Sequence, residues 1–517
     1  MYKYQLLHKP TFSTWPSSVL FVPKKTLIFI LILLVLSLVG IRWMKNSELN
    51  KFYKNHALRL RNLKYPNQPS DERLDAWRLT DIYQTHIFSA YFDDRPDVLL
   101  KEIPEALHNR VPWAMIRIIG IIRLDLEDLP LTCYYEYVKS SDGKKHFILK
   151  RANARIKPIA RDENFHMRYI AAFILCEFPT GDDTRGLTPV GVTVSKNYTR
   201  GYSDFGREDF VAIRYPADGF NSGKRKEEKF MAVCVPSFHH KFKNSPQLIE
   251  FVEFYRMMGA DRFTFYNGSI TPEVGRVLDY YSELNVTKVL QWRLPPYYIF
   301  EKTIRVDGLF ASINDCLYRS SSYMRYKYVA QVDVDEFIVP KRHANYMEMM
   351  KYLDPPKGEE SNRAASYVFR NAFFYLMHED DPVTQSADIP ILYLHAKTMR
   401  WPHTNIMHDR SKYIIRGQDV VEIGNHRVWD FRKGNSSFYR RAFEEVEVDP
   451  DVASSHHYRY CETEVETCWL RSTRRDTSAH RFTKELGKRV AKVCKEIFEN
   501  GCPKNPHSKL APKLSIY

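Results

Sequence analysis

Hydrophobic and polar positions alternate in a regular order between residues 230 and 332. Four short apolar runs predict strands at Phe230–Val235, Arg262–Tyr266, Val286–Trp292 and Tyr328–Val332. Between the runs, apolar residues recur three and four positions apart. This spacing predicts three helices. Two begin at Ser245-Pro246 and Thr271-Pro272, with Ser245 and Thr271 as the expected N-caps, and the third begins at Val306. Short strands that alternate with helices predict a parallel sheet with covering helices, which is an α/β fold.

Both sides of this segment carry more strand signals than helix signals. Before it, strands are predicted at 87–92, 113–122, 132–138 and 169–178, and after it at 366–374, 391–397 and 412–416. A stretch of charged and small residues at 221–229 predicts a linker. We therefore expect a β-rich domain over residues 81–228 and the α/β domain over residues 229–480.

The N-terminal region contains an uncharged apolar run, Thr26–Ile41, between Lys25 and Arg42. As a helix this run spans about 24 Å, and Trp43 and Met44 extend it toward the thickness of a bilayer. We expect a single transmembrane anchor over 26–44, a cytoplasmic tail over 1–25 and a stem over 45–80. A cleaved signal peptide is the alternative, but 25 residues before the apolar run is long for one.

Basic residues flank the anchor on both sides, so charge alone does not fix its orientation. All eight Cys follow the anchor, as do glycosylation sequons at positions 197, 267, 285 and 435. Both features favour a type II protein with a large lumenal part. Cys461 with Cys468, and Cys494 with Cys502, are candidate local disulfides; a zinc site is the alternative.

The composition is that of an ordinary globular protein, with 44% hydrophobic residues among 517 and a net charge of +15. Such a basic balance raises the question of nucleic acid as a partner. However, the net charge is +6 over residues 1–45 and +6 over residues 456–517, so the middle of the chain has a net charge of only +3. With a lumenal location, this distribution predicts no nucleic-acid partner, and we expect a basic C-terminal tail over 481–517.

The fourth predicted strand leads into three acids, Asp333, Asp335 and Glu336. In an extended chain, two Asp at i and i+2 point to the same side and could hold a divalent cation. A second Asp-x-Asp triplet at 449–451 follows no predicted strand, so the inference rests on the strand before Asp333 and not on the triplet itself. A solvated turn is the alternative. No Gly-x-Gly-x-x-Gly or P-loop follows the first strand, which argues against dinucleotide-binding enzymes, kinases and sulfotransferases.

Several segments together resemble glycosyltransferase family 92. The segments are Phe88–Arg95, Val233–Pro236, Glu253–Ala260, Asp315–Arg319, Asp333–Pro340, Arg410–Ile414 and His457–Arg459. The resemblance implies a GT-A fold, a Rossmann-like sheet that binds a UDP-sugar donor, and Mn²⁺-dependent transfer with inversion to a glycan or glycoprotein acceptor. It also implies a Golgi enzyme. The best-known activity of the family moves galactose from UDP-galactose onto fucose of N-glycans in a β1,4 linkage.

By that resemblance, Asp333 would lie near the donor ribose and the waters of the metal, and Asp335 would bind the metal directly. His426 and His457 are candidates for a further metal ligand. Each could instead be a structural histidine, since the chain has 18 histidines and most histidines are not metal ligands.

Inversion also needs a carboxylate base near the acceptor hydroxyl. Glu336, Asp409 and Asp430 are the candidates.

Arg410, Lys412 and Arg416 alternate along a predicted strand and could share a face that meets the diphosphate. A charged, solvent-exposed edge strand is the alternative. For the whole protein, the alternative to an enzyme is a glycan-binding protein that keeps the fold without turnover.

Overall fold

The computed structural model describes residues 31, 35, 37, 39–40, 75–102, 114–141, 144–178, 187–196, 198–217, 229–355, 363–381, 390, 392–433, 443–460 and 472–504. The chain divides into two compact units, Met1–Arg59 and Leu60–Tyr517. In the described part of the chain, no helix is both long and apolar enough to cross a membrane. The expected cytoplasmic tail, all of the expected linker but Lys229, and nearly all of the expected anchor and stem lie outside the described residues. The anchor therefore stays a prediction.

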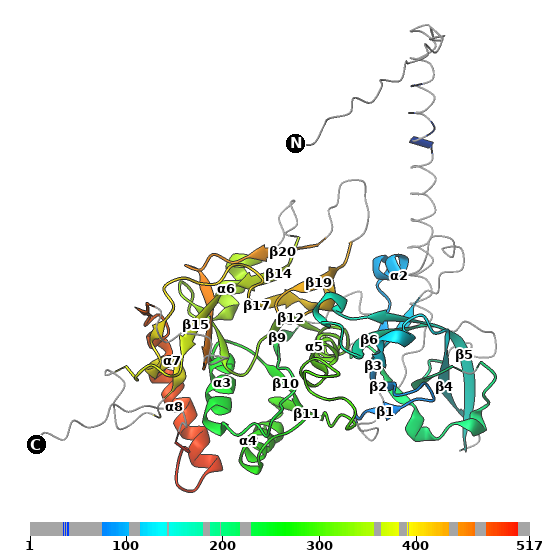
Figure 1. Cartoon of the computed structure of the whole chain (residues 1–517), viewed down its shortest axis with the longest axis horizontal. Helices are drawn as coiled ribbons and strands as arrows, with labels where there is room; N and C mark the ends of the chain where they lie inside the picture. Colours follow the sequence, from blue (N-terminus) through cyan, green and yellow to red (C-terminus); the bar gives the residue numbers. More distant parts are fainter. Residues whose placement is uncertain are drawn as a thin grey trace, which may run out of the picture. The chain divides into compact units, whose positions relative to one another are not determined.

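The first sheet has eight strands in the order β1-β2-β3-β6-β5-β4-β7-β8 (Figure 1). They are β1 (Arg78–Leu79), β2 (His86–Asp93), β3 (Met115–Arg123), β4 (Leu131–Ser141), β5 (Lys144–Pro158), β6 (Tyr169–Glu177), β7 (Gly191–Ser195) and β8 (Val211–Arg214). An additional pairing of β2 with β8 closes the sheet on itself around an apolar core. Sequence reasoning missed β5, because Lys and Arg on its solvent-facing side obscure the apolar pattern. Helix α2 (Pro96–Glu102) follows β2.

The second sheet has the order β11-β10-β9-β12-β17-β14-β20. Its strands are β9 (Lys229–Cys234), β10 (Arg262–Asn267), β11 (Thr287–Gln291), β12 (Tyr326–Gln331), β14 (Ala364–Phe369), β17 (Lys412–Arg416) and β20 (Glu444–Glu447). Strands β9 to β12 are parallel, and β17 is antiparallel to its two neighbours. The parallel part is the one that the alternation of the sequence predicts. The described residues therefore form a mixed α/β structure.

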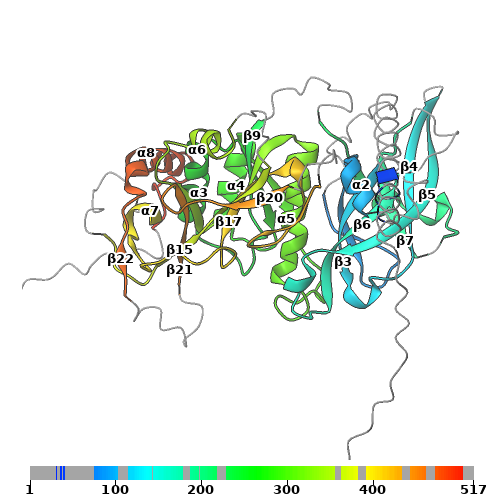
Figure 2. The ribbon, with the colours of Figure 1, turned by 90° about the horizontal axis from the view of Figure 1, so that it is seen from above.

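Helices cover both faces of the second sheet (Figures 1 and 2). Helices α3 (Ser245–Met257), α4 (Pro272–Glu283) and α6 (Tyr346–Leu353) share one core with it, and α5 (Leu309–Tyr318) contributes to another. Thr271 caps α4 as predicted, whereas the cap of α3 is Asn244, one residue before the expected Ser245. Gly259 ends the α3 segment with a φ of +103°, which favours glycine.

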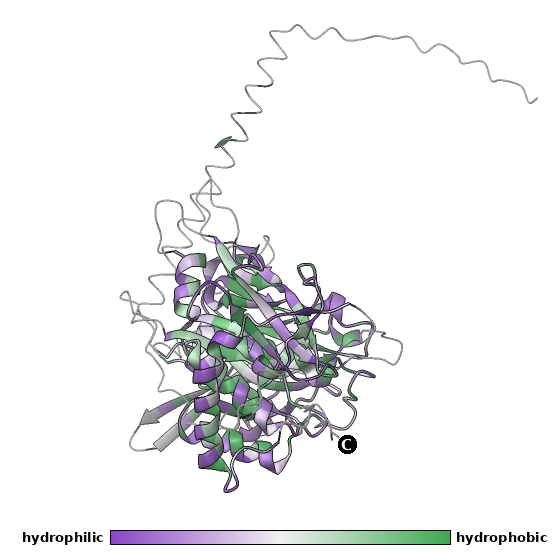
Figure 3. Ribbon diagram, turned by 90° about the vertical axis from the view of Figure 1, so that its left-hand side faces the viewer, coloured by the Kyte–Doolittle hydropathy of each residue, from purple (hydrophilic) through white to green (hydrophobic). Residues whose placement is uncertain are grey.

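Residues 480–497 differ from the expected basic tail, which we began at residue 481. They form helix α8 (His480–Ile497), which packs beside α3 (Figure 1). Its buried residues Phe482, Leu486, Val490 and Val493 recur at helical spacing, while the lysines face outward. Figure 3 shows this division of hydrophobic and hydrophilic positions along the elements. The high positive charge of this segment led us to miss its amphipathic pattern.

The third sheet has the order β13-β21-β15-β16-β22. Its strands are β13 (Glu336–Pro340), β15 (Asn371–Tyr375), β16 (Met399–Arg400), β21 (Ala453–Arg459) and β22 (Arg474–Arg475), and β18 (Val420–Ile423) and β19 (Val428–Phe431) form a separate hairpin. The single strand expected at 366–374 is thus two strands in different sheets. The strand expected at 391–397 is wrong, because helix α7 (Tyr393–Ala396) lies there. The buried carboxylate of Glu250 accepts the backbone N–H groups of Tyr393 and Leu394 and so fixes the start of this turn.

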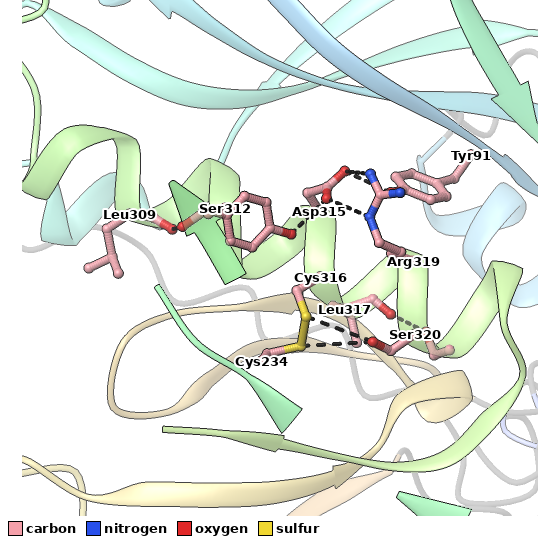
Figure 4. The surroundings of a disulfide bond; sticks show 11 residues. Tyr91, Cys234, Leu309, Ser312, Asp315, Cys316, Leu317, Arg319 and Ser320 are labelled. Carbon is pink, nitrogen blue, oxygen red and sulfur yellow. Dashed lines mark hydrogen bonds and ion pairs between the residues drawn. A yellow bond between two sulfur atoms is a disulfide. The ribbon is translucent and has the colours of Figure 1, made fainter. Parts of the chain in front are cut away.

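A buried polar network joins the first sheet to α5 (Figure 4). Asp315 on α5 accepts hydrogen bonds from Tyr91 (2.6 Å), Tyr266 (2.7 Å) and Ser89, and it pairs with Arg319 at 3.0 Å. These contacts connect strand β2 with the helix that covers the second sheet.

Three disulfides lie in the described part of the chain: Cys133–Cys176, Cys234–Cys316 and Cys494–Cys502. The second ties β9 to α5 next to the Asp315 network (Figure 4). The predicted pair Cys494–Cys502 is confirmed, whereas Cys461 and Cys468 lie outside the described residues.

Candidate active site

The three acids follow strand β12 at the carboxyl edge of the parallel strands, where ligands of such sheets bind. Asp333 and Asp335 do not lie on one extended strand, because a turn at Val334 and Asp335 separates β12 from β13, which begins at Glu336. Glu336 closes this turn, since its backbone N–H bonds the Asp333 carbonyl and its carboxylate accepts the Asp333 N–H at 2.9 Å. Asp333 and Asp335 therefore make different contacts rather than share one face.

Asp333 pairs with Lys412, which reaches the turn from β17. The fully buried Lys412 Nζ lies 2.8 Å from Asp333 Oδ2, 3.1 Å from Glu336 Oε2 and 3.0 Å from Asn425 Oδ1. Burial disfavours both charges, but the pair outweighs it, so the pKa of Asp333 falls to about 2 and the pKa of Lys412 rises. Lys412 is thus a counter-ion of the acids, with no side-chain surface exposed to a diphosphate.

Glu336 is buried within this group. Burial raises the pKa of its carboxyl to about 7, although Lys412 acts in the opposite direction. One carboxylate oxygen contacts Asp333 and Lys412, and the other lies 3.2 Å from His457 Nδ1 without hydrogen-bond alignment. A carboxylate without exposed surface does not meet an acceptor hydroxyl. The structure therefore gives Glu336 a supporting position in place of the expected role as base.

His457 on β21 lies directly opposite Glu336 in the strand register. Its Nε2 is 3.5 Å from Asp335 Oδ2, and the Asp335 side chain is 30% exposed. Burial works against a positive ring, yet Asp335 and Glu336 raise the pKa of His457 above its ordinary value. Of the four expected metal ligands, Asp335 and His457 are the two whose side chains come together.

His426 lies next to Asn425, which accepts a hydrogen bond from Lys412. Its Nδ1 is 3.3 Å from the Ser411 carbonyl and its Nε2 is 3.1 Å from Asn425 Nδ2. Burial and the Lys412 charge lower the pKa of His426 to about 3, so the ring is neutral. Among the described residues, no group of three or more His, Cys, Asp or Glu is arranged to hold a metal ion. The expected set of four ligands does not assemble.

The remaining candidates are Arg410, Arg416, Asp409 and Asp430. Arg410 precedes β17 in a turn with a φ of +58° and so does not share a strand face with Lys412. Arg416 pairs with Asp419 at 3.1 Å and with Asp354 at 3.4 Å. Asp409 is exposed and accepts a hydrogen bond from Asn405 at 2.7 Å. Asp430 on β19 pairs with Lys101 and Lys157, which belong to α2 and β5.

Sequence reasoning missed several buried polar residues on the strands around the site. In the described part of the chain, the side chains of Gln331, Asn371 and Ser455 have no hydrogen-bond partner. Gln331 ends β12, and Asn371 lies opposite Ser455 in the pairing of β15 with β21. An unpaired buried polar group costs about 1–3 kcal/mol. Polar residues within otherwise apolar strands were the signal that could have marked them.

Comparison with solved structures finds distant likeness. The chain is 12% identical to S. aureus TarS in complex with UDP, covering 36% of this chain and 47% of that one at a TM-score of 0.20. It is 11% identical to TarS in complex with UDP-GlcNAc (52% and 67% covered, TM-score 0.23) and 12% identical to the mannosyltransferase Ktr4p from S. cerevisiae (31% and 43%, TM-score 0.18). The chain thus spans less than half the length of the first TarS structure. No curated protein sequence matches it.

The sequence profile of glycosyltransferase family 92 matches residues 229–496, which is more than half of the chain. The match begins at β9 and includes the acids, Lys412, His457 and most of α8. It covers all the segments that resemble this family except Phe88–Arg95, and it extends into the helix that we had expected to be a tail. The chain belongs to glycosyltransferase family 92.

Proposed function

We propose that this protein transfers a hexose from a UDP-sugar to a glycan acceptor at the carboxyl edge of β12. Its family supports glycosyl transfer, and one observation carries the choice of site. The partly exposed Asp335 and the imidazole of His457 converge at 3.5 Å, next to a buried group of charges that holds them in place. A GT-A fold is the architecture that we propose for residues 229–480.

A divalent cation fits part of this arrangement. A carboxylate oxygen and an imidazole nitrogen are ligands that Mn²⁺ accepts, and Glu336 behind His457 Nδ1 is the kind of partner that orients a ligating histidine. Asp335 and His457 would hold the ion, whereas Asp333 is occupied by Lys412. The ion, when bound, would supply positive charge to the diphosphate of the donor.

The finer assignments rest on the family resemblance alone. They are galactose as the transferred sugar, inversion, and a β1,4 linkage to fucose of N-glycans. Asp409 is the candidate base with an exposed carboxylate, since Glu336 is buried and Asp430 is paired with two lysines.

The test incubates the full chain in detergent with a panel of UDP-sugars and Mn²⁺, with EDTA in parallel, and measures UDP release. We expect release with one donor, stimulation by the metal, and a loss of activity in Asp335→Asn. Asp451→Asn is the matched control, because it changes the exposed second Asp-x-Asp triplet. If no donor is turned over, the proposed reaction is wrong, and a glycan-binding protein that keeps the fold is the alternative.

We also propose that the protein is a type II Golgi membrane protein with a lumenal catalytic part. The apolar run at 26–41 and the disulfides support this location. Two sequons in the described residues allow a test, because Asn285 is exposed whereas Asn267 is half-buried within β10. Expression in animal cells followed by glycosidase digestion should show a glycan that Asn285→Gln removes. Asn267→Gln should change nothing, and an unglycosylated chain would contradict the lumenal location.

A further inference from the structure

One face of the third sheet continues from the candidate site to a group of aromatic side chains. In the strand register, Glu336 on β13 lies opposite His457 on β21, which lies opposite Phe373 on β15. Residues opposite each other in adjacent strands point to the same face of a sheet. Because β21 lies between β13 and β15, Glu336 and Phe373 flank His457 on opposite sides.

The other face of the same strands faces the main core. Phe337, Phe374 and Tyr458 alternate with the residues above and belong to the core that includes α3 and α8. Their rings contact one another, with centroids 5.7 Å apart for Phe337 and Tyr458. The side chains of Glu336, His457 and Phe373 therefore lie on the sheet face opposite these three rings.

The aromatic group consists of Phe373, Tyr375, Trp401 and the adjacent Met377, and we call it the aromatic platform. It forms a cluster of its own, separate from the larger cores. Trp401 packs against Phe373 at 5.5 Å and against Tyr375 at 5.6 Å, and it is itself only partly buried. The ring of Phe373 lies 5.2 Å from His457, so the platform is continuous with the candidate site.

We propose that the aromatic platform binds a sugar ring of the acceptor, with Trp401 as the residue that contacts it. This inference rests on the proposed function. A pyranose ring has an apolar face of C–H groups, which packs on the electron-rich face of an aromatic ring. The guanidinium of Arg459 lies 5.6 Å from the Phe373 ring, so a charged donor for sugar hydroxyls borders the platform.

The position of the aromatic platform would also keep the acceptor sugar apart from the donor. Lys412, Asp333 and Glu336 lie on one flank of His457, and the platform lies on the other. A donor held at the acids and an acceptor held at Trp401 would meet next to His457 and Asp335.

The test compares Trp401→Ala and Trp401→Phe in the full chain, with a fucosylated N-glycan oligosaccharide as the acceptor probe. We expect Trp401→Ala to raise the KM for this acceptor at least tenfold, while UDP release without acceptor changes less than twofold. Trp401→Phe should recover most of the affinity. The control is Trp429→Ala, a partly buried tryptophan on β19 that lies under Arg427 and bonds Glu163.

Calorimetric binding of the same oligosaccharide makes the test independent of turnover. If the wild-type chain releases no UDP but binds the oligosaccharide through Trp401, the proposed reaction fails and the platform stands. The platform is overturned if Trp401→Ala binds as tightly as wild type, if Trp429→Ala weakens binding equally, or if the wild-type chain binds no oligosaccharide.

Discussion

This protein has two buried groups of charged side chains. They contain similar chemical groups but differ in how many of their polar atoms are hydrogen-bonded. The Asp315 carboxylate accepts hydrogen bonds from the Arg319 guanidinium, two tyrosines and a serine (Figure 4). Around Asp333, Lys412 joins two carboxylates, but one oxygen of Glu336 and Nδ1 of His457 have no hydrogen bond within the described residues.

The difference separates a structural network from a chemical one. A fully paired network in the interior fixes two elements against each other, here β2 and α5. A partly paired network at the carboxyl edge of a sheet keeps capacity for a ligand, and its Asp335 is open to solvent. Saturation of hydrogen bonds, rather than the number of charges, distinguishes the two regions.

The largest expected effect comes from Asp315→Ala, which leaves Arg319 buried without its main counter-charge. Breaking a buried ion pair from one side costs about 3–5 kcal/mol. Urea unfolding followed by tryptophan fluorescence should show this loss in the free energy of unfolding. Asp125→Ala, which removes the partner of Arg123 at an exposed pair, is the control and should leave the midpoint unchanged. Equal effects of the two variants would contradict a structural role for the Asp315 network.

In contrast to Asp315→Ala, Asp335→Asn should lower activity without lowering stability. We expect UDP release to fall about 10²–10³-fold, which corresponds to about 3–4 kcal/mol of transition-state stabilisation. The urea midpoint should stay at the wild-type value, because the side chain is partly exposed and Glu336 still closes the turn. A loss of stability as large as that of Asp315→Ala would show that the two regions do not differ in kind.

Glu250 provides an intermediate case, since it is a buried carboxyl that accepts two backbone N–H groups and has no ion pair among the described residues. Burial raises its pKa to about 8, and the two hydrogen bonds oppose this only in part. The folded protein therefore holds a proton that the unfolded chain releases above pH 4.5. This contribution to stability is complete below pH 4.5 and is lost as the pH rises to about 8.

Glu250→Gln removes that dependence. Relative to wild type, the free energy of unfolding of the variant should rise steadily between pH 5 and pH 8, as measured by urea unfolding at several pH values. A constant difference between variant and wild type over this range would contradict the raised pKa of Glu250. Glu283→Gln, on the exposed end of α4, is the control.

The smallest expected effect on stability comes from the Cys494–Cys502 disulfide, which belongs to neither group of charges. The Cys494–Cys502 disulfide closes a sequence separation of only 8 residues. Chain entropy then gives it about 2 kcal/mol of stabilisation. Cys494→Ala with Cys502→Ala should lower the free energy of unfolding by about that amount and leave UDP release unchanged. A loss of activity in this variant would mean that α8 influences the site.

The sequence by itself determined the parallel half of the second sheet, the cap at Thr271 and the resemblance to the family. These features depend on residues close together in the chain, since periodicity and capping act over a few positions. The acids after β12 were also recognisable, because an apolar strand that leads into three carboxylates is a local pattern. The same local reasoning failed for α8, where the positive charge obscured the apolar face.

Only the tertiary structure decided what each acid contacts. Lys412 and Asp333 are 79 positions apart, and Glu336 meets His457 through a pairing of β13 with β21. No local pattern shows that Glu336 is buried, that His457 and not His426 meets Asp335, or that Phe373 flanks His457. The partners of a charge depend on which strands become neighbours, and the folding of the whole chain sets those neighbours.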